Sequence, residues 1–413
     1  MNDHYDLSRM IDEKLLFTVL QPIISVKKKT VIGIEALSRG IDEKNKDVIP
    51  PVILFKQASK NIADLIKLDR ACREDALTKF KLIRKDHEGL ILFINVESAI
   101  LNSVGPSDHI LNMVNRLGIK PHEVILEINE SKTPKTDALY DFSRRYKEYG
   151  FMIALDDVGS GFSNLNRIPL LNPNIIKIDR FLVTDIDKNY YKQEVFKSLV
   201  NLSSSIGALV VAEGVETYEE AITVTELGLD MIQGYLISKP VDCKITSHEI
   251  QSTIFELTGR YKKHIRESNA FKKVFLDKIK LVASEIIEQL SGSCTDDIEN
   301  LMKDIIMNKQ NFECIYVLDE AGIQISDTVF HPDYRLKNNN LLFSPASKGA
   351  DHSLKRYYYH LMSSQNNLYI SEDYLSMATG DLCRTVSEVY RDKNNELKIV
   401  CIDFFAEKFS PCY

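Results

Sequence analysis

The chain has 413 residues, 44% of them hydrophobic, and a formal net charge of −7. This length exceeds one ordinary domain and suits a barrel of about 250 residues followed by a smaller domain. The negative charge argues against binding to a nucleic-acid polymer or a membrane surface. No apolar run approaches the roughly 18 residues of a membrane span, so we expect none.

The cysteine and histidine patterns indicate a reducing compartment and no zinc site. The seven cysteines are scattered, odd in number and without a C-x-x-C motif, which is typical of reduced thiols. The nine histidines form no H-x-x-H or H-E-x-x-H motif, so a bound metal would need oxygen ligands. The polar N-terminal sequence has no signal-peptide core, and we expect a cytoplasmic protein.

Eight short apolar runs predict strands, and the segments between most of them have helical character. Several runs are apolar throughout, as parallel strands buried on both faces are. The predicted strands cover residues 16–23, 31–37, 90–95, 123–128, 151–156, 174–179, 208–213 and 231–237. Eight strands with intervening helices predict an α/β fold, a modified (β/α)8 TIM-like barrel.

Two local signals refine this barrel. The link between the first two strands, SVKKKT at 25–30, is too short for a crossover helix, so we expect one antiparallel strand. Residues 137–150 are helix-like and end in Gly150, a residue typical of helix C-caps.

The rest of the chain has a different pattern. Residues 246–290 carry apolar residues at helical spacing and predict one or two helices, whose basic face we interpret as solvated. From about residue 295 the pattern is β-rich. We therefore predict a barrel domain over 1–245, a helical linker over 246–290 and a small α+β domain over 291–413.

Turn signals divide the last domain. Residues 312–326 predict a hairpin that turns at Asp319–Gly322. Residues 368–405 predict three further strands, with turns at 379–380 and 394–395.

Polar residues stand at the ends of the predicted barrel strands, where the loops of such a barrel build its active site. They are Gln21, Glu35, Asn95, Glu127, Asp156, Asp157, Lys177, Glu213 and Gln233. Most are about one βα unit apart, so they should converge on one rim. Carboxylates gathered without a cation would repel one another. Hard divalent cations with oxygen ligands resolve this repulsion, and the set suits Mg²⁺ or Mn²⁺.

The adjacent acids Asp156 and Asp157 can place one carboxylate on each of two ions. Two ions about 3.5–4 Å apart can activate a water and stabilise both oxygens of an in-line phosphoryl displacement. The residue types thus favour phosphoester hydrolysis. They leave enolase-like proton abstraction and a purely structural barrel open as alternatives.

The same stretches carry a family resemblance over residues 15–240. They are QPI (21–23), GIEALSR (33–39), Asn95 in FINVES, EINES (127–131), DDVGSGFSNL (156–165), IKID (176–179), VAEGVET (211–217) and QGYLISKP (233–240). In this order they resemble the EAL-domain family of cyclic di-GMP phosphodiesterases.

The resemblance implies metal-dependent hydrolysis of cyclic di-GMP to linear 5′-pGpG. It implies a cyclic-guanylate-specific phosphodiesterase with two Mg²⁺ or Mn²⁺ ions, and Ca²⁺ is expected to be inhibitory. The alternative is a catalytically weak receptor that binds cyclic di-GMP and signals through its C-terminal domain.

The resemblance also implies a role for each matching position. The metal ligands would be Glu35, Asn95, Glu127, Asp156, Asp157 and Glu216. Glu213 would be the general base, and Lys177 would hold the attacking water or the scissile phosphate. The substrate contacts would be Gln21, Leu37, Arg39 and Gln233, with Arg39 placed for a phosphate and Leu37 for a guanine. Glu130 would tether the loop after Asp157, which in the family reaches the metals and the dimer interface.

Three positions depart from the family pattern without removing a metal ligand. Val158 stands where Phe is usual, Ser160 where Thr is usual, and Gly40 where an aromatic residue is usual. Loss of the aromatic would loosen stacking on the substrate, and Val158 would alter the loop. Since binding-only members normally lose one or more of the acids, the sequence favours an active enzyme.

The C-terminal stretch resembles a PAS-like or Cache-like sensor, and its pairing with the barrel resembles the YkuI-like group of EAL proteins. The candidates for contact with an unknown small ligand are Arg356, Tyr358, Tyr374 and Thr385. A dimerisation or packing role without a ligand is the alternative. We expect a homodimer, because symmetric pairs are the commonest soluble oligomers.

Overall fold

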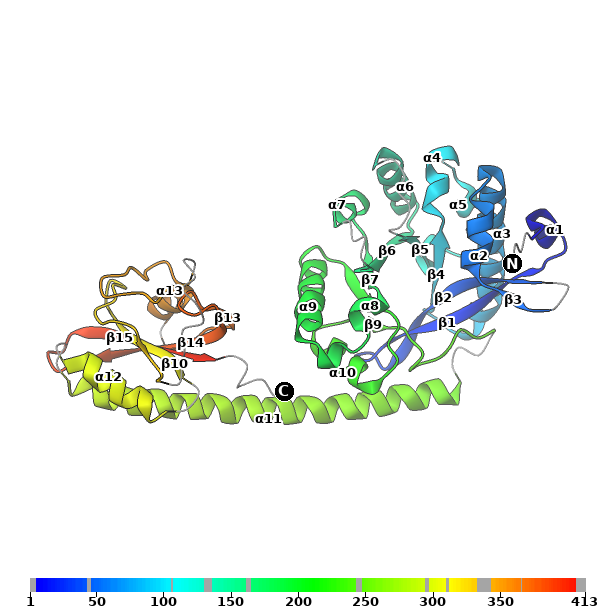
Figure 1. Cartoon of the computed structure of the whole chain (residues 1–413). Helices are drawn as coiled ribbons and strands as arrows, with labels where there is room; N and C mark the ends of the chain where they lie inside the picture. The colour runs from blue at the N-terminus through cyan, green and yellow to red at the C-terminus, as the bar shows by residue number, and fades with distance from the viewer. Residues whose placement is uncertain are drawn as a thin grey trace. The chain divides into compact units, whose positions relative to one another are not determined.

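The computed structural model (Figure 1) forms two compact units, Met1–Ile265 and Arg266–Tyr413. It describes residues 5–42, 46–104, 107–129, 136–160, 165–242, 247–293, 297–309, 312–332, 343–364 and 366–405.

The first unit is a closed barrel of eight strands with one further strand at its edge. The barrel strands are β1 (Leu16–Ser25), β2 (Thr30–Ile41), β4 (Ile91–Val96), β5 (Val124–Asn129), β6 (Met152–Val158), β7 (Ile175–Ile178), β8 (Leu209–Ala212) and β9 (Met231–Ile232). Strand β1 pairs antiparallel with both β2 and β9, and the other barrel pairs are parallel. The short β3 (Val48–Ile49) pairs antiparallel with the end of β2. The predicted barrel with its antiparallel strand is confirmed.

The last barrel strand is shorter than the predicted run 231–237. The chain leaves the sheet after Ile232 because Gly234 lies directly against the backbone of Val215. A Cβ at Gly234 would lie 2.0 Å from the Val215 carbonyl oxygen, so a side chain there is excluded. The Val215 amide donates to the Gln233 carbonyl, and the Leu236 amide donates to the Val215 carbonyl. These two hydrogen bonds fix the turn.

Helices surround the barrel, as the intervening segments predict. They are α1 (Leu7–Asp12), α2 (Pro51–Ala58), α3 (Ile62–Ile83), α4 (Leu101–Val104), α5 (His109–Leu117), α6 (Thr136–Glu148), α7 (Arg167–Leu171), α8 (Arg180–Val183), α9 (Tyr190–Ser205) and α10 (Tyr218–Glu226). Single turns of 3-10 helix are η1 (Arg84–Asp86), η2 (Ser98–Ile100), η3 (Pro121–Glu123) and η4 (Ile186–Lys188). Helix α6 ends just before Gly150, which has φ +92°, as predicted.

The strands bury both of their faces, in two separate apolar clusters. One joins alternate strand residues such as Leu92 and Leu126 to helix residues such as Phe80 and Phe196. The other contains strand residues alone and fills the barrel interior: Ile23, Phe93, Ile125, Ala154, Ile175, Val211 and Met231. Phe93 fits there because Gly33 has no side chain; a Cβ at Gly33 would lie 2.6 Å from the Phe93 ring.

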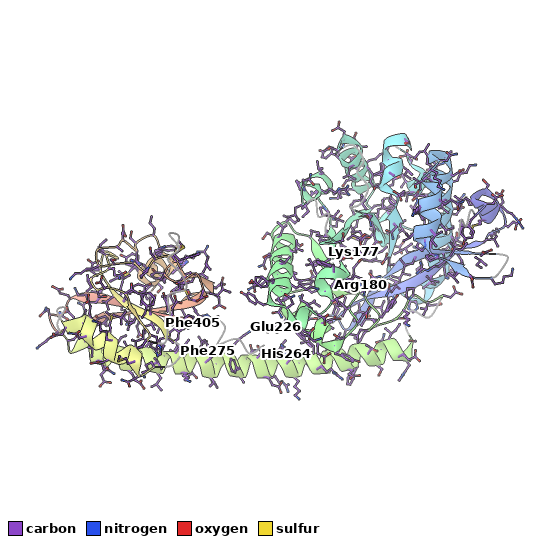
Figure 2. All side chains as sticks on the ribbon, viewed as in Figure 1. Lys177, Arg180, Glu226, His264, Phe275 and Phe405 are labelled. Atoms are coloured by element: carbon purple, nitrogen blue, oxygen red, sulfur yellow. The ribbon has the colours of Figure 1, made fainter. Side chains whose placement is uncertain are left out.

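Helix α11 (His248–Ser291) begins in the first unit and continues into the second. Its first turns join the barrel core through Ile250, Ile254 and Leu257. Further along, His264 Nε2 lies 2.7 Å from Oε2 of Glu226 on α10 (Figure 2). Helix α10 is therefore held by the same helix that enters the second unit.

The second unit contains an antiparallel sheet in the order β11-β10-β15-β14-β12, with β13 paired to β14. The strands are β10 (Phe312–Asp319), β11 (Val329–Phe330), β12 (Leu368–Ile370), β13 (Tyr374–Leu375), β14 (Leu382–Arg391) and β15 (Leu397–Phe405). One face packs on α11 and on α12 (Ile298–Met307). The other face packs on α13 (Arg356–Ser363) through Tyr357 and Leu361.

The turns of this unit agree with the sequence. Gly322, at φ +85°, bonds through its amide to the Asp319 carbonyl, and Gly380 and Asn395 also have positive φ. The short β13 makes four strands between residues 368 and 405, where three were expected. Among the described residues, no helix has the length and apolar character that crossing a membrane needs.

Candidate active site

The polar residues predicted at the strand ends lie on the inner face of the barrel. Side chains alternate along a strand, so the residue two positions beyond an interior apolar residue points the same way. In β4 to β9, a predicted site residue stands two positions after the residue that fills the barrel interior. These site residues are Asn95, Glu127, Asp156, Lys177, Glu213 and Gln233. Strand β1 runs in the opposite direction, so Gln21 precedes Ile23, and Gln21 pairs in register with Glu35 of β2.

Lys177 is the centre of this group and is fully buried. Its Nζ atom lies 2.5 Å from Glu213 Oε1 and 2.6 Å from Glu127 Oε1. The same atom lies 3.2 Å from Asp156 Oδ1 and 3.4 Å from Glu35 Oε2. One ammonium group thus neutralises part of the charge of four carboxylates, which come from β2, β5, β6 and the end of β8.

The electrostatics of the group reflect this crowding. Burial opposes the charged form of Lys177, but the surrounding carboxylates outweigh it and raise the pKa of Lys177 well above its ordinary value. Burial, followed by the charge of Glu35, raises the pKa of Glu127. Burial also raises the pKa of Glu213 well above the ordinary value, although Lys177 acts in the opposite sense. The site therefore holds more negative charge than one lysine compensates.

Asp157 is set apart from its neighbours by its backbone. Its φ of +57° lies in the left-handed region, which a residue other than glycine adopts at a cost in strain. The Asn129 amide donates to Oδ2 of Asp157. Burial, then the charges of Asp156 and Asp179, raise the pKa of Asp157 to about 6.

The donor set fits a hard divalent cation. Asp156, Asp157 and Glu213 each offer an oxygen, and these oxygens lie within 4.8 Å of one another. Glu127 Oε2 is buried and has no hydrogen-bond partner among the described residues. Carboxylate oxygens in this arrangement are the ligands that Mg²⁺, Mn²⁺ and Ca²⁺ take.

The amides of the site orient Glu35. The Asn95 side chain donates to Glu35 Oε1 at 3.2 Å, and Gln233 donates to Glu35 Oε2 at 2.6 Å. Gln233 also donates to Gln21 Oε1 at 3.1 Å, and Gln21 donates to the Ser238 carbonyl at 3.1 Å. Glu35 is thereby fixed with one oxygen toward each amide.

The structure does not bring every predicted site residue to Lys177. Glu216 is exposed, and its Oε1 atom lies 3.4 Å from the guanidinium of Arg180. It does not belong to the group formed by Asp156, Asp157 and Glu213. Arg180 and Lys177 are both labelled in Figure 2. The Arg39 guanidinium donates to the Ser38 carbonyl at 2.8 Å. Glu130 lies outside the described residues.

A cavity of about 560 Å³ adjoins this centre through Glu35 and Asn95, and Leu37 lines it as well. Its other walls include Phe55, Asp69 and Arg73, which the sequence reasoning missed. Asp69 and Arg73 form a buried ion pair four residues apart on α3, and burial raises the pKa of Asp69. Asp and Arg are rarely buried unless they are paired, so an Asp and an Arg four residues apart among the apolar positions of a helix could have identified this pair from the sequence.

Comparison with known proteins places the barrel in a known family. Residues 4–240 match the sequence pattern of the EAL domain. The chain is 24% identical over 401 residues to the uncharacterized EAL-domain containing protein YkuI of Bacillus subtilis, over 94% of each chain. The crystal structure of YkuI with cyclic di-GMP and calcium has a TM-score of 0.80 and covers 97% of this chain and 99% of YkuI at 21% identity. That likeness shows a shared fold over both units.

Two further relatives resemble the barrel alone. The cyclic di-GMP phosphodiesterase PdeL of Escherichia coli is 28% identical over 239 residues, which are 54% of this chain and 61% of PdeL. A structure of the PaMucR phosphodiesterase in complex with c-di-GMP has a TM-score of 0.53 at 25% identity. It covers 58% of this chain and 97% of that chain.

Proposed function

This chain belongs to the EAL domain family, and we propose that it hydrolyses one phosphodiester bond of cyclic di-GMP to give linear 5′-pGpG. The observation that carries the proposal is the group of four carboxylates around the buried Lys177. The experiment that tests it is chromatography of the products after incubation with cyclic di-GMP and Mn²⁺. Binding without turnover would instead identify a receptor.

The acids and amides of the rim are proposed to hold two Mg²⁺ or Mn²⁺ ions. The first would be held by Glu35, Asn95, Glu127 and Asp156, and the second by Asp157 with support from Glu216. Bound ions would polarise the phosphate and the attacking water. The adjacent Asp156 and Asp157, whose carboxylate oxygens lie within 4.8 Å of each other, support the placement of two neighbouring ions.

Glu213 is proposed to accept the proton of the attacking water. The water oxygen forms the new bond to phosphorus, the bond from phosphorus to the 3′ oxygen breaks, and the 3′ oxygen leaves with a proton. The position of Glu213 suits this role, because its carboxylate oxygen lies within 4.8 Å of oxygens of Asp156 and Asp157, and a general base must lie within reach of the proton that it takes. Lys177 keeps Glu213 oriented at 2.5 Å and offers its positive charge to the phosphate.

The substrate contacts proposed are Gln21, Leu37, Arg39 and Gln233. Leu37 lines the cavity beside the acidic centre, which supports a base-binding role. Arg39 follows two residues later on β2 and has the directed donors that suit a phosphate.

We propose for the rest of the chain the organisation that the sequence predicts. Residues 1–245 would be the catalytic domain, 246–290 a helical linker, and 291–413 a PAS/Cache-like sensor or dimerisation domain in a cytoplasmic homodimer. Within the second unit, Tyr374 OH lies 2.5 Å from Thr385 Oγ1, so two of the four candidate ligand contacts are together. Tyr358 donates to the Glu320 carbonyl instead, and Arg356 is exposed at the start of α13.

A further inference from the structure

Helix α2 presents one face to the cavity beside the acidic centre. Its cavity-lining residues are Pro51, Val52, Phe55 and Lys56, and Ser59 at its C-cap lines the cavity as well. The last four of these residues lie one, four, five and eight positions after Pro51, which places all five on one face of a helix. The opposite side of α2 packs into the protein through Leu54 and Ala58, which are almost fully buried. The orientation of the cavity face is therefore set by the packing of the helix.

The packing of α2 also accounts for Gly40, where the family resemblance leads us to expect an aromatic residue. A Cβ at Gly40 would lie 2.7 Å from Met10 Cε and 3.2 Å from Leu54 Cδ1. Helices α1 and α2 thus occupy the space that a side chain at this position would need. Position 40 therefore faces the apolar cluster that contains Met10 and Leu54 and does not line the cavity.

Phe55 is the one aromatic side chain among the described residues that line the cavity. It is half-buried, so part of its ring remains accessible. Its neighbour Val52 is 75% exposed, which extends the apolar surface. Exposed apolar surface next to a charged centre is typical of a ligand site, and Glu35 and Asn95 line the same cavity.

We infer that Phe55 stacks on one nucleobase of the bound dinucleotide. This inference rests on the proposed function, because the phosphate must lie at the acidic centre for a base to reach α2. Phe55 is a positioning residue: it holds the base and takes no part in proton transfer. Aromatic stacking tolerates any base, so Phe55 contributes affinity without selecting guanine over adenine.

The test compares Phe55→Ala, Phe55→Leu and Phe55→Trp in the full chain. The dissociation constant for cyclic di-GMP is measured by calorimetry with Ca²⁺, and KM and kcat are measured with Mn²⁺. Loss of stacking in Phe55→Ala should raise the dissociation constant and KM about 5- to 100-fold with kcat unchanged. Phe55→Leu should be intermediate, and Phe55→Trp should bind at least as tightly as the parent.

Two readouts separate stacking from a structural effect. A cyclic dinucleotide with 2-aminopurine in place of one guanine should lose fluorescence on binding to the parent and to Phe55→Trp, and less on binding to Phe55→Ala. Ile53→Ala is the matched control, since Ile53 lies on α2, is 43% exposed and does not line the cavity. It should leave binding unchanged, and Mn²⁺ affinity should be equal in all variants.

Failure of this inference is distinct from failure of the proposed function. Binding of cyclic di-GMP by the parent, with an equal dissociation constant for Phe55→Ala, overturns the role of Phe55 alone. Equal losses in Phe55→Ala and Ile53→Ala overturn it too, because the effect would then belong to the fold of α2. A parent protein that neither binds nor hydrolyses cyclic di-GMP overturns the proposed function, and this inference with it.

Discussion

The Nζ atom of Lys177 lies 2.5 Å from Oε1 of Glu213, at the neighbouring ends of the parallel strands β7 and β8. The pair is held in place because the Glu213 amide bonds to the Ile178 carbonyl, one residue beyond the lysine. Lys177 also lies within 3.4 Å of three other carboxylates. Its position is that of an internal counter-ion for these acids.

Replacement of Lys177 by Met should destabilise the metal-free protein. Removal of one partner of a buried ion pair leaves uncompensated charge, which typically lowers the free energy of unfolding by about 3–5 kcal/mol. Added Mg²⁺ should stabilise Lys177→Met more than the parent, because the carboxylates lack their counter-ion. Urea unfolding with and without Mg²⁺ measures both effects. Lys188→Met, on an exposed side chain, is the control, and equal stability of Lys177→Met and the parent would contradict the account.

Replacement of Glu213 by Gln should abolish most turnover and preserve binding. An amide cannot accept the proton of the attacking water, and loss of a general base typically lowers the rate by about 10²- to 10⁴-fold. Calorimetry should still detect Mn²⁺ and cyclic di-GMP binding. The matched control is Glu219→Gln, on the exposed surface of α10. Parent-like kcat in Glu213→Gln would show that another group takes the proton.

Replacement of Arg39 by Ala should weaken substrate binding and leave kcat nearly unchanged. A charge-assisted hydrogen bond to a phosphate contributes about 1.5–3 kcal/mol, so KM should rise about 10- to 100-fold. Arg39→Lys should recover part of this affinity, since it keeps the charge and loses the two-donor geometry. Steady-state kinetics check the split between KM and kcat, with the exposed Arg116→Ala as control. A fall in kcat at unchanged KM would place Arg39 in the chemical step.

The stability of the second unit should fall as pH rises toward neutrality because of Asp403. Burial raises the pKa of this carboxyl to about 7, although the Thr385 hydroxyl, which donates to it at 2.6 Å, favours the ionised form. Between about pH 4 and pH 7 the folded state keeps a proton that the unfolded chain releases, so the free energy of unfolding decreases with pH. The total loss is about 4 kcal/mol and is complete above pH 7.

Asp403→Asn should remove this dependence, because an amide does not titrate. Urea unfolding of the full chain at several pH values measures the difference between parent and variant. Asp304→Asn, an exposed residue of α12, should behave like the parent. A parent whose stability rises with pH relative to Asp403→Asn would show that the carboxyl is charged in the folded state.

Much of the barrel and its rim could be predicted because both follow from local patterns. Apolar runs mark the strands, the SVKKKT link forces an antiparallel pair, and period-two alternation carries polar residues such as Glu127 and Lys177 to one face. These rules depend on neighbouring residues alone. They therefore predict which residues lie on the same face of the barrel, but they do not predict the distances between those residues.

Other features depend on contacts between distant segments, which a pattern does not contain. Helix α2 carries Phe55 into the cavity wall because Leu54 packs on Gly40. Strand β9 ends early because Gly234 meets the backbone of Val215. The left-handed backbone of Asp157 and the turning of Glu216 toward Arg180 likewise belong to the tertiary structure.

The most direct measurement of the central claim is chromatography of cyclic di-GMP after incubation with the purified chain and Mn²⁺. The account predicts conversion to linear 5′-pGpG, loss of this conversion in excess EDTA and its return on addition of Mg²⁺ or Mn²⁺. Ca²⁺ should permit binding with little product, because its larger radius and loose geometry misplace the attacking water. Undiminished conversion after metal analysis has verified complete removal would contradict the account, as would tight binding with no product in Mn²⁺ or Mg²⁺.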